Sequence, residues 1–203
     1  MNINNYCSNF DWQVLNLSDN LLPWEVLGKL EDCLLEAISS LGSDYTIVNN
    51  IAIHSSAKVD PTAQIKPPAL IGPDCFIGPG VLLRGGVYLG KSVIIGPTCE
   101  VKSSIVCSGS AVAHFNYVGD SIIGSGVDLE AGAMVVNYYN EREDKEISVF
   151  VDGAKIDTGV IKFGAIIGDN TKIGANAVIA PGTILDKNSI VKRLELIDQS
   201  QQP

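Results

Sequence analysis

Branched aliphatic residues recur along the chain with a period of six residues, which is the clearest pattern in the sequence. A helix favours a period of 3.6 and a simple strand a period of two, whereas a hexapeptide period is typical of a parallel β-helix. We expect each hexad to form a short strand and a turn with the aliphatic side chain inward, and about three hexads to form one coil. The matching positions are Ile53, Val59, Ile65, Ile71, Ile77, Leu83, Leu89, Ile95 and Val101.

Glycine often follows the inward residue, for example at Gly72, Gly78, Gly90 and Gly96. We expect these glycines to supply a turn conformation that other side chains disfavour. The alternative fold is a sandwich of short strands. The regular period disfavours it, because sandwich strands recur irregularly at about 8–12 residues.

The segment ahead of the ladder has a helical pattern from Pro23 to Leu41, and Gly42 closes it. Because a solenoid exposes the edge of its first coil, we expect this helix to cap that end, and a docking helix for a partner is the alternative. We expect residues 1–20 to be loosely structured or laid across the solenoid. The predicted domains are an N-terminal extension at 1–50 and a β-helix at 51–203. The apolar helix face comprises Leu27, Leu30, Leu34, Ile38 and Leu41.

The six-residue register shifts by one residue twice, once before and once after the sequence SAVAHFNYVGD at 110–120. A break in a regular repeat often marks backbone that is shaped for a ligand rather than for packing. The inward positions around these shifts are Val106, Val112, Val118, Ile123, Leu129 and Val135.

One long interruption follows at 137–160. Its charged run EREDKE leads into ISVFV, the pair Asp152-Gly153 and AKI, which predicts a projecting β-hairpin with a tight Asp-Gly turn. A long loop in a regular coil is usually functional or disordered. The ladder is expected to resume at Ile161, Ile167, Ile173, Ile179 and Leu185.

Charge and composition narrow the possible partners. A formal net charge of −9 argues against nucleic acid or an anionic membrane as the main partner. No apolar run approaches the roughly 18 residues that span a bilayer, and the N-terminus has no basic and apolar leader, so we expect a cytoplasmic protein. The five cysteines contain no CxxC pair, and we expect them to be reduced packing residues that form no metal site.

Four segments resemble a known family: EVKSSIV, AHFNYVGDSIIG, AGAMVVNYYN and IIGDNTKIGANAVIAPG. They are similar to the β-helix half of the bifunctional enzymes that make UDP-N-acetylglucosamine, where glucosamine-1-phosphate N-acetyltransferase activity resides. The archaeal sugar-phosphate acetyl- and nucleotidyltransferases are more similar still. The HxxYxGD element is the most specific part of a resemblance that covers roughly residues 50–190. It implies a left-handed β-helix, a homotrimer with sites between chains, and acetyl-CoA as co-substrate without a required metal.

The resemblance also implies residue roles. His114 matches the base that takes a proton from the sugar's amino group as that group attacks the thioester. Imidazole titrates near neutrality, which suits this role, and a phosphate favours arginine, lysine and a phenol. The residues that match sugar or phosphate contacts are Arg84, Lys102, Tyr117, Asp128 and Asn137. Those expected along the coenzyme A groove, which is built mainly from main-chain groups, are Ala131, Gly132, Ala165 and Ala175.

Each assignment has an alternative without a ligand. His114 is also compatible with a hydrogen-bonded structural histidine. Arg84 and Lys102 are each compatible with a solvated corner of the coil, and Asn137 with the opening of the long loop.

The chain departs from the family's pattern at Asp128 and Glu130, which replace an asparagine and a glycine. Asp128 brings a negative charge near an expected phosphate site and suggests a different amino sugar. We predict a trimeric N-acetyltransferase that acts on a glucosamine-1-phosphate-like amino-sugar 1-phosphate. The alternative is a non-catalytic hexapeptide-repeat protein that binds a sugar nucleotide or regulates a partner. A gamma-class carbonic anhydrase is disfavoured, because its zinc needs about three histidines and the chain has two.

Overall fold

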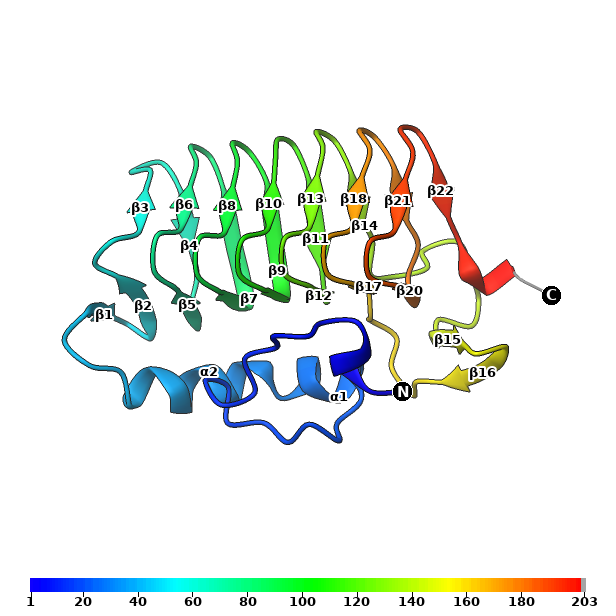
Figure 1. Ribbon diagram of the computed structural model, residues 1–203, viewed down its shortest axis with the longest axis horizontal. Coiled ribbons are helices and arrows are strands. Elements are labelled where there is room, and N and C mark those ends of the chain that lie inside the picture. Colours follow the sequence, from blue (N-terminus) through cyan, green and yellow to red (C-terminus); the bar gives the residue numbers. More distant parts are fainter. Residues whose placement is uncertain (202–203) are drawn as a thin grey trace.

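The aliphatic ladder lines the interior of a parallel β-solenoid, whose coils follow one another along the long axis in Figure 1. The computed structural model describes residues 1–201. The inward side chains form one continuous buried core, so the predicted all-β β-helix is confirmed. Ile161 was wrongly assigned to the ladder. Its side chain is 54% exposed, and the solenoid resumes instead with Ala165 and Ile167.

Each coil contributes to three faces, along which successive coils pair in parallel. The Asp128 face comprises β3 (Lys58–Val59), β6 (Phe76–Ile77), β8 (Ile94–Ile95), β10 (Ala111–Val112), β13 (Asp128–Leu129), β18 (Lys172–Ile173) and β21 (Ile190–Val191). The Tyr117 face comprises β4 (Gln64–Ile65), the first parts of β7 (Leu82–Leu89) and β9 (Glu100–Val106), β11 (Tyr117–Gly119), β14 (Met134–Val135), β19 (Val178–Ile179) and β22 (Leu196–Ile197). The covered face comprises β1 (Tyr45–Val48), β2 (Ile51–His54), β5 (Ala69–Ile71), the second parts of β7 and β9, β12 (Ile122–Ile123), β17 (Ala165–Ile167) and β20 (Thr183–Leu185). Only β1 pairs antiparallel in these faces, with β2.

The predicted helix is present as two short helices, α1 (Pro23–Gly28) and α2 (Leu30–Ser39), after an N-terminal 3-10 turn, η1 (Ile3–Asn5). The amphipathic pattern located the buried side of α2 correctly. The buried residues of α2 are Leu30, Cys33, Leu34, Ala37 and Ile38.

The position of these helices corrects the expectation of a cap. The α2 helix packs against β5, β7 and β9, so it lies along the flank of the solenoid and not across its first coil (Figure 1). The physical reason is a row of apolar side chains that points outward from the covered face and needs burial. This row forms a second core with the helices, and its members are Ala52, Leu70, Tyr88, Ile105, Ile122, Ile166 and Ile184.

Residues 1–22 are laid across the same face, which was one of the two expectations. Their apolar side chains join the second core. Asp169 fixes this segment to a late coil, because its carboxylate accepts hydrogen bonds from the backbone N–H groups of Ser8 and Ser125, both at 2.8 Å. The N-terminal segment is therefore part of the solenoid's packing.

The 137–160 insertion contains the predicted hairpin, β15 (Ser148–Val151) and β16 (Ala154–Asp157). Asp152-Gly153 forms its turn with φ angles of 51° and 75°. The hairpin packs beside β20 and the terminal 3-10 turn η2 (Gln199–Gln201), near the C-terminal end of the solenoid (Figure 1).

The glycines after the inward residues have a different purpose from the expected one. Gly72 and Gly96 do not take positive φ angles, which fall two residues later, at Asp74 (58°) and Thr98 (57°). A Cβ atom on Gly96 would lie 1.5 Å from the Ala113 carbonyl oxygen of the next coil. These glycines therefore allow neighbouring coils to approach closely.

Candidate functional site

The irregular positions of the repeat stack at one corner of the solenoid, between the Tyr117 face and the covered face. The β7 strand bulges here between Arg84 and Val87, and the next two coils pass the corner with one residue fewer. The 137–160 insertion leaves the solenoid at the same corner. The register shifts and the insertion thus mark one place. We name it the Lys102 corner, and it comprises Arg84, Lys102, Asp120 and Asn137.

A partly buried ion pair holds Lys102 at this corner. Its Nζ atom lies 2.6 Å from Asp120 Oδ2 and 3.2 Å from Ser103 Oγ, and the Lys102 and Asp120 side chains are 15% and 14% exposed. The Asn137 amide also donates a hydrogen bond to Asp120. One carboxylate therefore fixes the positions of an ammonium and an amide donor.

Arg84 is the register partner of Lys102 in the preceding coil. Glu100 Oε1 lies 2.7 Å from Arg84 Nε and 2.6 Å from a terminal nitrogen of the same guanidinium. Both side chains are partly exposed. Because guanidinium binds phosphate at least as readily as carboxylate, an incoming phosphate competes with Glu100 for Arg84.

Tyr117 projects from β11 among these charges. Burial raises the pKa of its phenol above the ordinary value, Asp120 and Glu100 raise it further, and Arg84 lowers it. The hydroxyl is therefore protonated at neutral pH and can donate a hydrogen bond to an anionic ligand.

A cavity of about 520 Å³ opens at the Lys102 corner and is lined by Arg84, Lys102, Tyr117, Asn137, Tyr138, Ile161 and Lys162. Sequence reasoning missed the last three residues. It placed Ile161 in the ladder and assigned no role to Tyr138 or Lys162. In the structure Lys162 is exposed and forms no ion pair within residues 1–201. Its cationic group is therefore available to a ligand in the cavity.

His114 lies at the other border of the Tyr117 face, on the corner shared with the Asp128 face. Its carbonyl oxygen accepts a hydrogen bond from the Gly132 N–H at 2.8 Å. Its imidazole is exposed and makes no side-chain hydrogen bond or ion pair with residues 1–201. The next residue, Phe115, has a φ of 55° and a side chain that is 65% exposed. The imidazole is thus not held as a buried structural histidine would be.

The predicted sugar-binding residues fall into separate groups. Tyr117 and Asn137 share one cavity with the two cations of the Lys102 corner, and that cavity does not include His114. Gly119, the register partner of Lys102, follows His114 by five residues, which span at most about 16 Å of extended chain. Asp128 is exposed on β13 and thus lies on a different face of the solenoid.

Three of the predicted coenzyme A contacts lie on the corner that carries His114. Ala131, Gly132 and Ala175 follow His114 there in successive coils, linked by backbone hydrogen bonds. Ala165 differs, because it is fully buried at the start of β17 on the covered face. Its side chain therefore has no exposed surface for a ligand.

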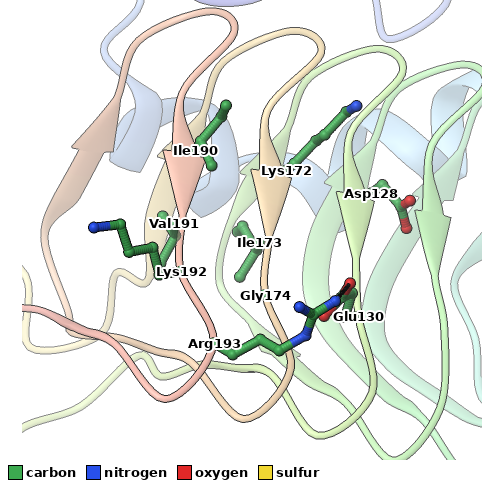
Figure 2. A pocket seen from close by; sticks show the side chains of 9 residues that line it. All are labelled: Asp128, Glu130, Lys172, Ile173, Gly174, Ile190, Val191, Lys192 and Arg193. Carbon is green, nitrogen blue, oxygen red and sulfur yellow. Dashed lines mark hydrogen bonds and ion pairs between the residues drawn. The ribbon is translucent and has the colours of Figure 1, made fainter.

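A second cavity, of about 490 Å³, lies on the Asp128 face near the C-terminal coils (Figure 2). Arg193 reaches across Gly174 toward Glu130, and its terminal nitrogen lies 2.5 Å from Glu130 Oε1. Lys172 and Lys192 point away from this pair in Figure 2. The sequence marked Glu130 as a departure but gave no indication of its partner, which is 63 residues away.

Within residues 1–201 no group of three or more histidine, cysteine, aspartate and glutamate side chains has a geometry that holds a metal ion. The five cysteines are buried free thiols. None of the helices in the described part of the chain is long and apolar enough to cross a bilayer.

The repeat matches the family model of the bacterial transferase hexapeptide (six repeats), over residues 68–103 and 164–192. These parts of the chain therefore contain hexapeptide repeats of this kind. The match covers early and late coils, and the segment between them contains His114, Asp120 and the insertion.

Two curated relatives of this chain have the names of bifunctional proteins. The bifunctional sugar-1-phosphate nucleotidylyltransferase/acetyltransferase of Sulfurisphaera tokodaii is 41% identical over 83 residues, which cover 41% of this chain and 20% of the relative. The bifunctional protein GlmU of Methanococcus maripaludis is 37% identical over 181 residues, which cover 87% of this chain and 43% of the relative. The chain thus spans less than half the length of these relatives. The resemblance predicted from the sequence motifs is confirmed.

A solved structure adds only a weak similarity. A mutant of AntD, an N-acyltransferase from Bacillus cereus in complex with dTDP and coenzyme A, is 16% identical with a TM-score of 0.31, and the alignment covers 73% of this chain and 70% of that chain.

Proposed function

We propose that this chain transfers an acetyl group from acetyl-CoA to the amino group of an amino-sugar 1-phosphate. The observation that carries the proposal is the cavity at the Lys102 corner, which collects Arg84, Lys102 and Lys162 beside the Tyr117 phenol. Guanidinium, ammonium and phenol groups are favourable donors to a phosphate ester. The name of the Sulfurisphaera tokodaii relative supports the same class of substrate.

The phosphate of the sugar lies against Lys102 and Lys162 in this proposal. Asp120 keeps the Lys102 ammonium in place through the 2.6 Å ion pair, while Arg84 exchanges Glu100 for a phosphate oxygen. The sugar ring then extends over Tyr117, whose protonated hydroxyl donates a hydrogen bond to it.

His114 acts as the general base. Its imidazole takes a proton from the sugar's amino group as the nitrogen attacks the thioester carbonyl carbon of acetyl-CoA. The new carbon–nitrogen bond forms the amide, the carbon–sulfur bond breaks, and the departing thiolate takes the proton from the His114 imidazolium and leaves as the coenzyme A thiol. A positioned base typically contributes about 10²–10⁴ in rate.

A trimer brings the two parts of the site together. Within one chain, His114 and Asp128 lie on the other border and the neighbouring face of the solenoid from the Lys102 corner. The cavity lined by Arg84, Lys102 and Tyr117 does not include His114 of the same chain, so a sugar phosphate bound there needs a base from elsewhere. In the proposed trimer one copy supplies Lys102 and Tyr117, and the adjacent copy supplies His114 and Asp128.

The test is an acetylation assay over a panel of amino-sugar 1-phosphates, read as release of free coenzyme A. The wild-type chain is expected to turn over at least one member, and His114→Ala to lower kcat about 10²–10⁴-fold with little change in KM. His54→Ala is the matched control, because His54 bonds Ser56 in the first coil, away from both cavities. If the chain binds a sugar phosphate but turns over no member of the panel, the non-catalytic alternative is favoured.

A further inference from the structure

The Glu130 carboxylate accepts hydrogen bonds from two donors, a guanidinium and a backbone N–H, and both kinds of donor also bind anionic ligands. Its Oε1 atom accepts a hydrogen bond from the Arg193 guanidinium at 2.5 Å, and its Oε2 atom accepts one from the Ala175 backbone N–H at 2.8 Å. Figure 2 shows the Arg193 side chain extended across the coil that contains Gly174 to reach this carboxylate. The two donors thus form an anion-binding arrangement that is occupied by the protein's own side chain.

Gly174 keeps this path open. A Cβ atom at that position would lie 2.5 Å from the Arg193 backbone nitrogen, so the close stacking of the two coils leaves no room for a side chain. No side chain therefore stands between Glu130 and Arg193.

This arrangement lies on the same corner as His114. Backbone hydrogen bonds link His114 to Gly132, Ala131 to Asn176, and Ala175 to Leu194. Each of these bonds joins one coil to the next along this corner. Neighbouring parallel strands are about 4.8 Å apart, which places Arg193 about 14 Å along the corner from His114. An elongated ligand with its reactive end at His114 and an anionic end would reach Arg193.

We propose that Glu130 is an internal competitor of the acyl donor, whose phosphate displaces the Glu130 carboxylate from Arg193 and the Ala175 N–H. The inference rests on the proposed function, in which the acyl donor is acetyl-CoA, a thioester whose coenzyme A part carries phosphate groups. Glu130 thereby sets how tightly the acyl donor binds. Arg193 binds the acyl donor only when its ion pair with Glu130 opens.

The pair is suited to exchange. The Glu130 and Arg193 side chains are 41% and 71% exposed, and exposed ion pairs contribute little to stability. The pKa of the Glu130 carboxyl lies below its ordinary value, mainly because Arg193 donates a hydrogen bond to it. The carboxylate therefore stays charged and paired at neutral pH, and the pair is lost only as the pH falls through that lowered pKa.

Isothermal titration of the full chain with coenzyme A tests the inference. Glu130→Gln is expected to bind coenzyme A about three- to fivefold more tightly than wild type, because the competing charge is gone. Arg193→Ala is expected to bind it about tenfold more weakly, because a charge-assisted hydrogen bond is lost. In the double variant the effect of Glu130→Gln should disappear, since the competition acts through Arg193.

Glu195→Gln is the matched control. It removes the same charge two residues after Arg193, and Glu195 accepts a hydrogen bond from the Lys192 N–H at 2.6 Å. Its affinity for coenzyme A should stay at the wild-type value. An unchanged or weakened affinity in Glu130→Gln overturns the inference, as does a tightening that persists without Arg193.

Inorganic pyrophosphate as a second probe separates this inference from the proposed function. If pyrophosphate binds Glu130→Gln more tightly while coenzyme A binds no variant, the competition at Arg193 stands as an anion site and the acyl-donor function fails. If the wild type turns over acetyl-CoA but no affinity responds to Glu130→Gln, the function stands and the role of Glu130 is overturned.

Discussion

The two corners that border the Tyr117 face are built differently. At the His114 corner most coils turn in the same way, with a positive φ at corresponding residues such as Thr98, Phe115 and Asn176. At the Lys102 corner one coil bulges, two pass with one residue fewer, and the next opens into the 137–160 insertion. The regular corner exposes an imidazole and backbone groups, while the irregular corner holds charged pairs around a cavity.

The comparison shows where this solenoid tolerates change. Val101 and Val118 stay fully buried in the ladder although the corners that follow them are shortened. The corner residues point away from the aliphatic core, so their number and charge vary without opening it. Chemistry that needs an irregular backbone can therefore be placed at one corner while the other keeps the coils in register.

The largest expected effect on activity comes from placing the intact Lys102 corner and the intact His114 corner on different copies of the chain. His114→Ala lacks the base, and the double variant Arg84→Ala with Lys102→Ala lacks the phosphate donors, so each alone should be nearly inactive at low sugar concentration. If each site takes one corner from each of two copies, co-expression of equal amounts should restore about a quarter of the wild-type activity, because about one site in four receives two intact corners.

Native mass spectrometry of the co-expressed chains is the control for this experiment, since it reports whether mixed trimers form. Mixed trimers without any recovered activity would mean that both corners act within one chain.

Gly96→Ala should cause the largest loss of stability among single changes near the regular corner. Its Cβ atom would meet the Ala113 carbonyl oxygen at 1.5 Å, so the coils that carry His114 must move apart. We expect the free energy of unfolding to fall by about 3 kcal/mol, measured by urea denaturation. Gly28→Ala is the control, because no atom lies within 4 Å of its added Cβ, and it should be neutral or slightly stabilising.

Lys102→Ala should act on substrate binding at the irregular corner. Loss of a charge-assisted contact to the phosphate is expected to raise KM for the sugar about tenfold and to leave KM for acetyl-CoA unchanged. Steady-state kinetics with each substrate varied in turn provide the check. Lys91→Ala, at an exposed lysine 4.0 Å from Asp74, should leave both constants at their wild-type values. Equal increases in both constants would indicate a general loss of structure at the corner.

Phe115→Gly should have the smallest effect. The left-handed backbone at Phe115 disfavours a side chain, so glycine is expected to raise the stability of the isolated chain by about 0.5 kcal/mol, measured as a small increase in Tm. A clear loss of stability in the assembled protein would show instead that the exposed Phe115 ring packs against a neighbouring copy.

Part of the site was predictable because its residues follow the repeat. Arg84 and Lys102 follow inward residues in consecutive coils, and the register shifts pointed to the segment that contains His114. Lys162 was missed because none of the motifs includes it, and the 54% exposure of Ile161 shows that this part of the insertion lies outside the ladder. The flank position of the helix had an overlooked indication, since apolar residues such as Leu70 and Tyr88 directly precede inward ones.

The sequence by itself determined the solenoid, the amphipathic helix and the hairpin, because each depends on a local period or on a two-residue turn. Only the tertiary structure decided that the register shifts and the insertion meet at one corner, that the glycines serve close approach, and that Glu130 pairs with Arg193. These features depend on how coils far apart in the chain stack on one another. The period fixes which side chains point inward, but the outward side chains take their partners from neighbouring coils and layers, and no local pattern encodes those.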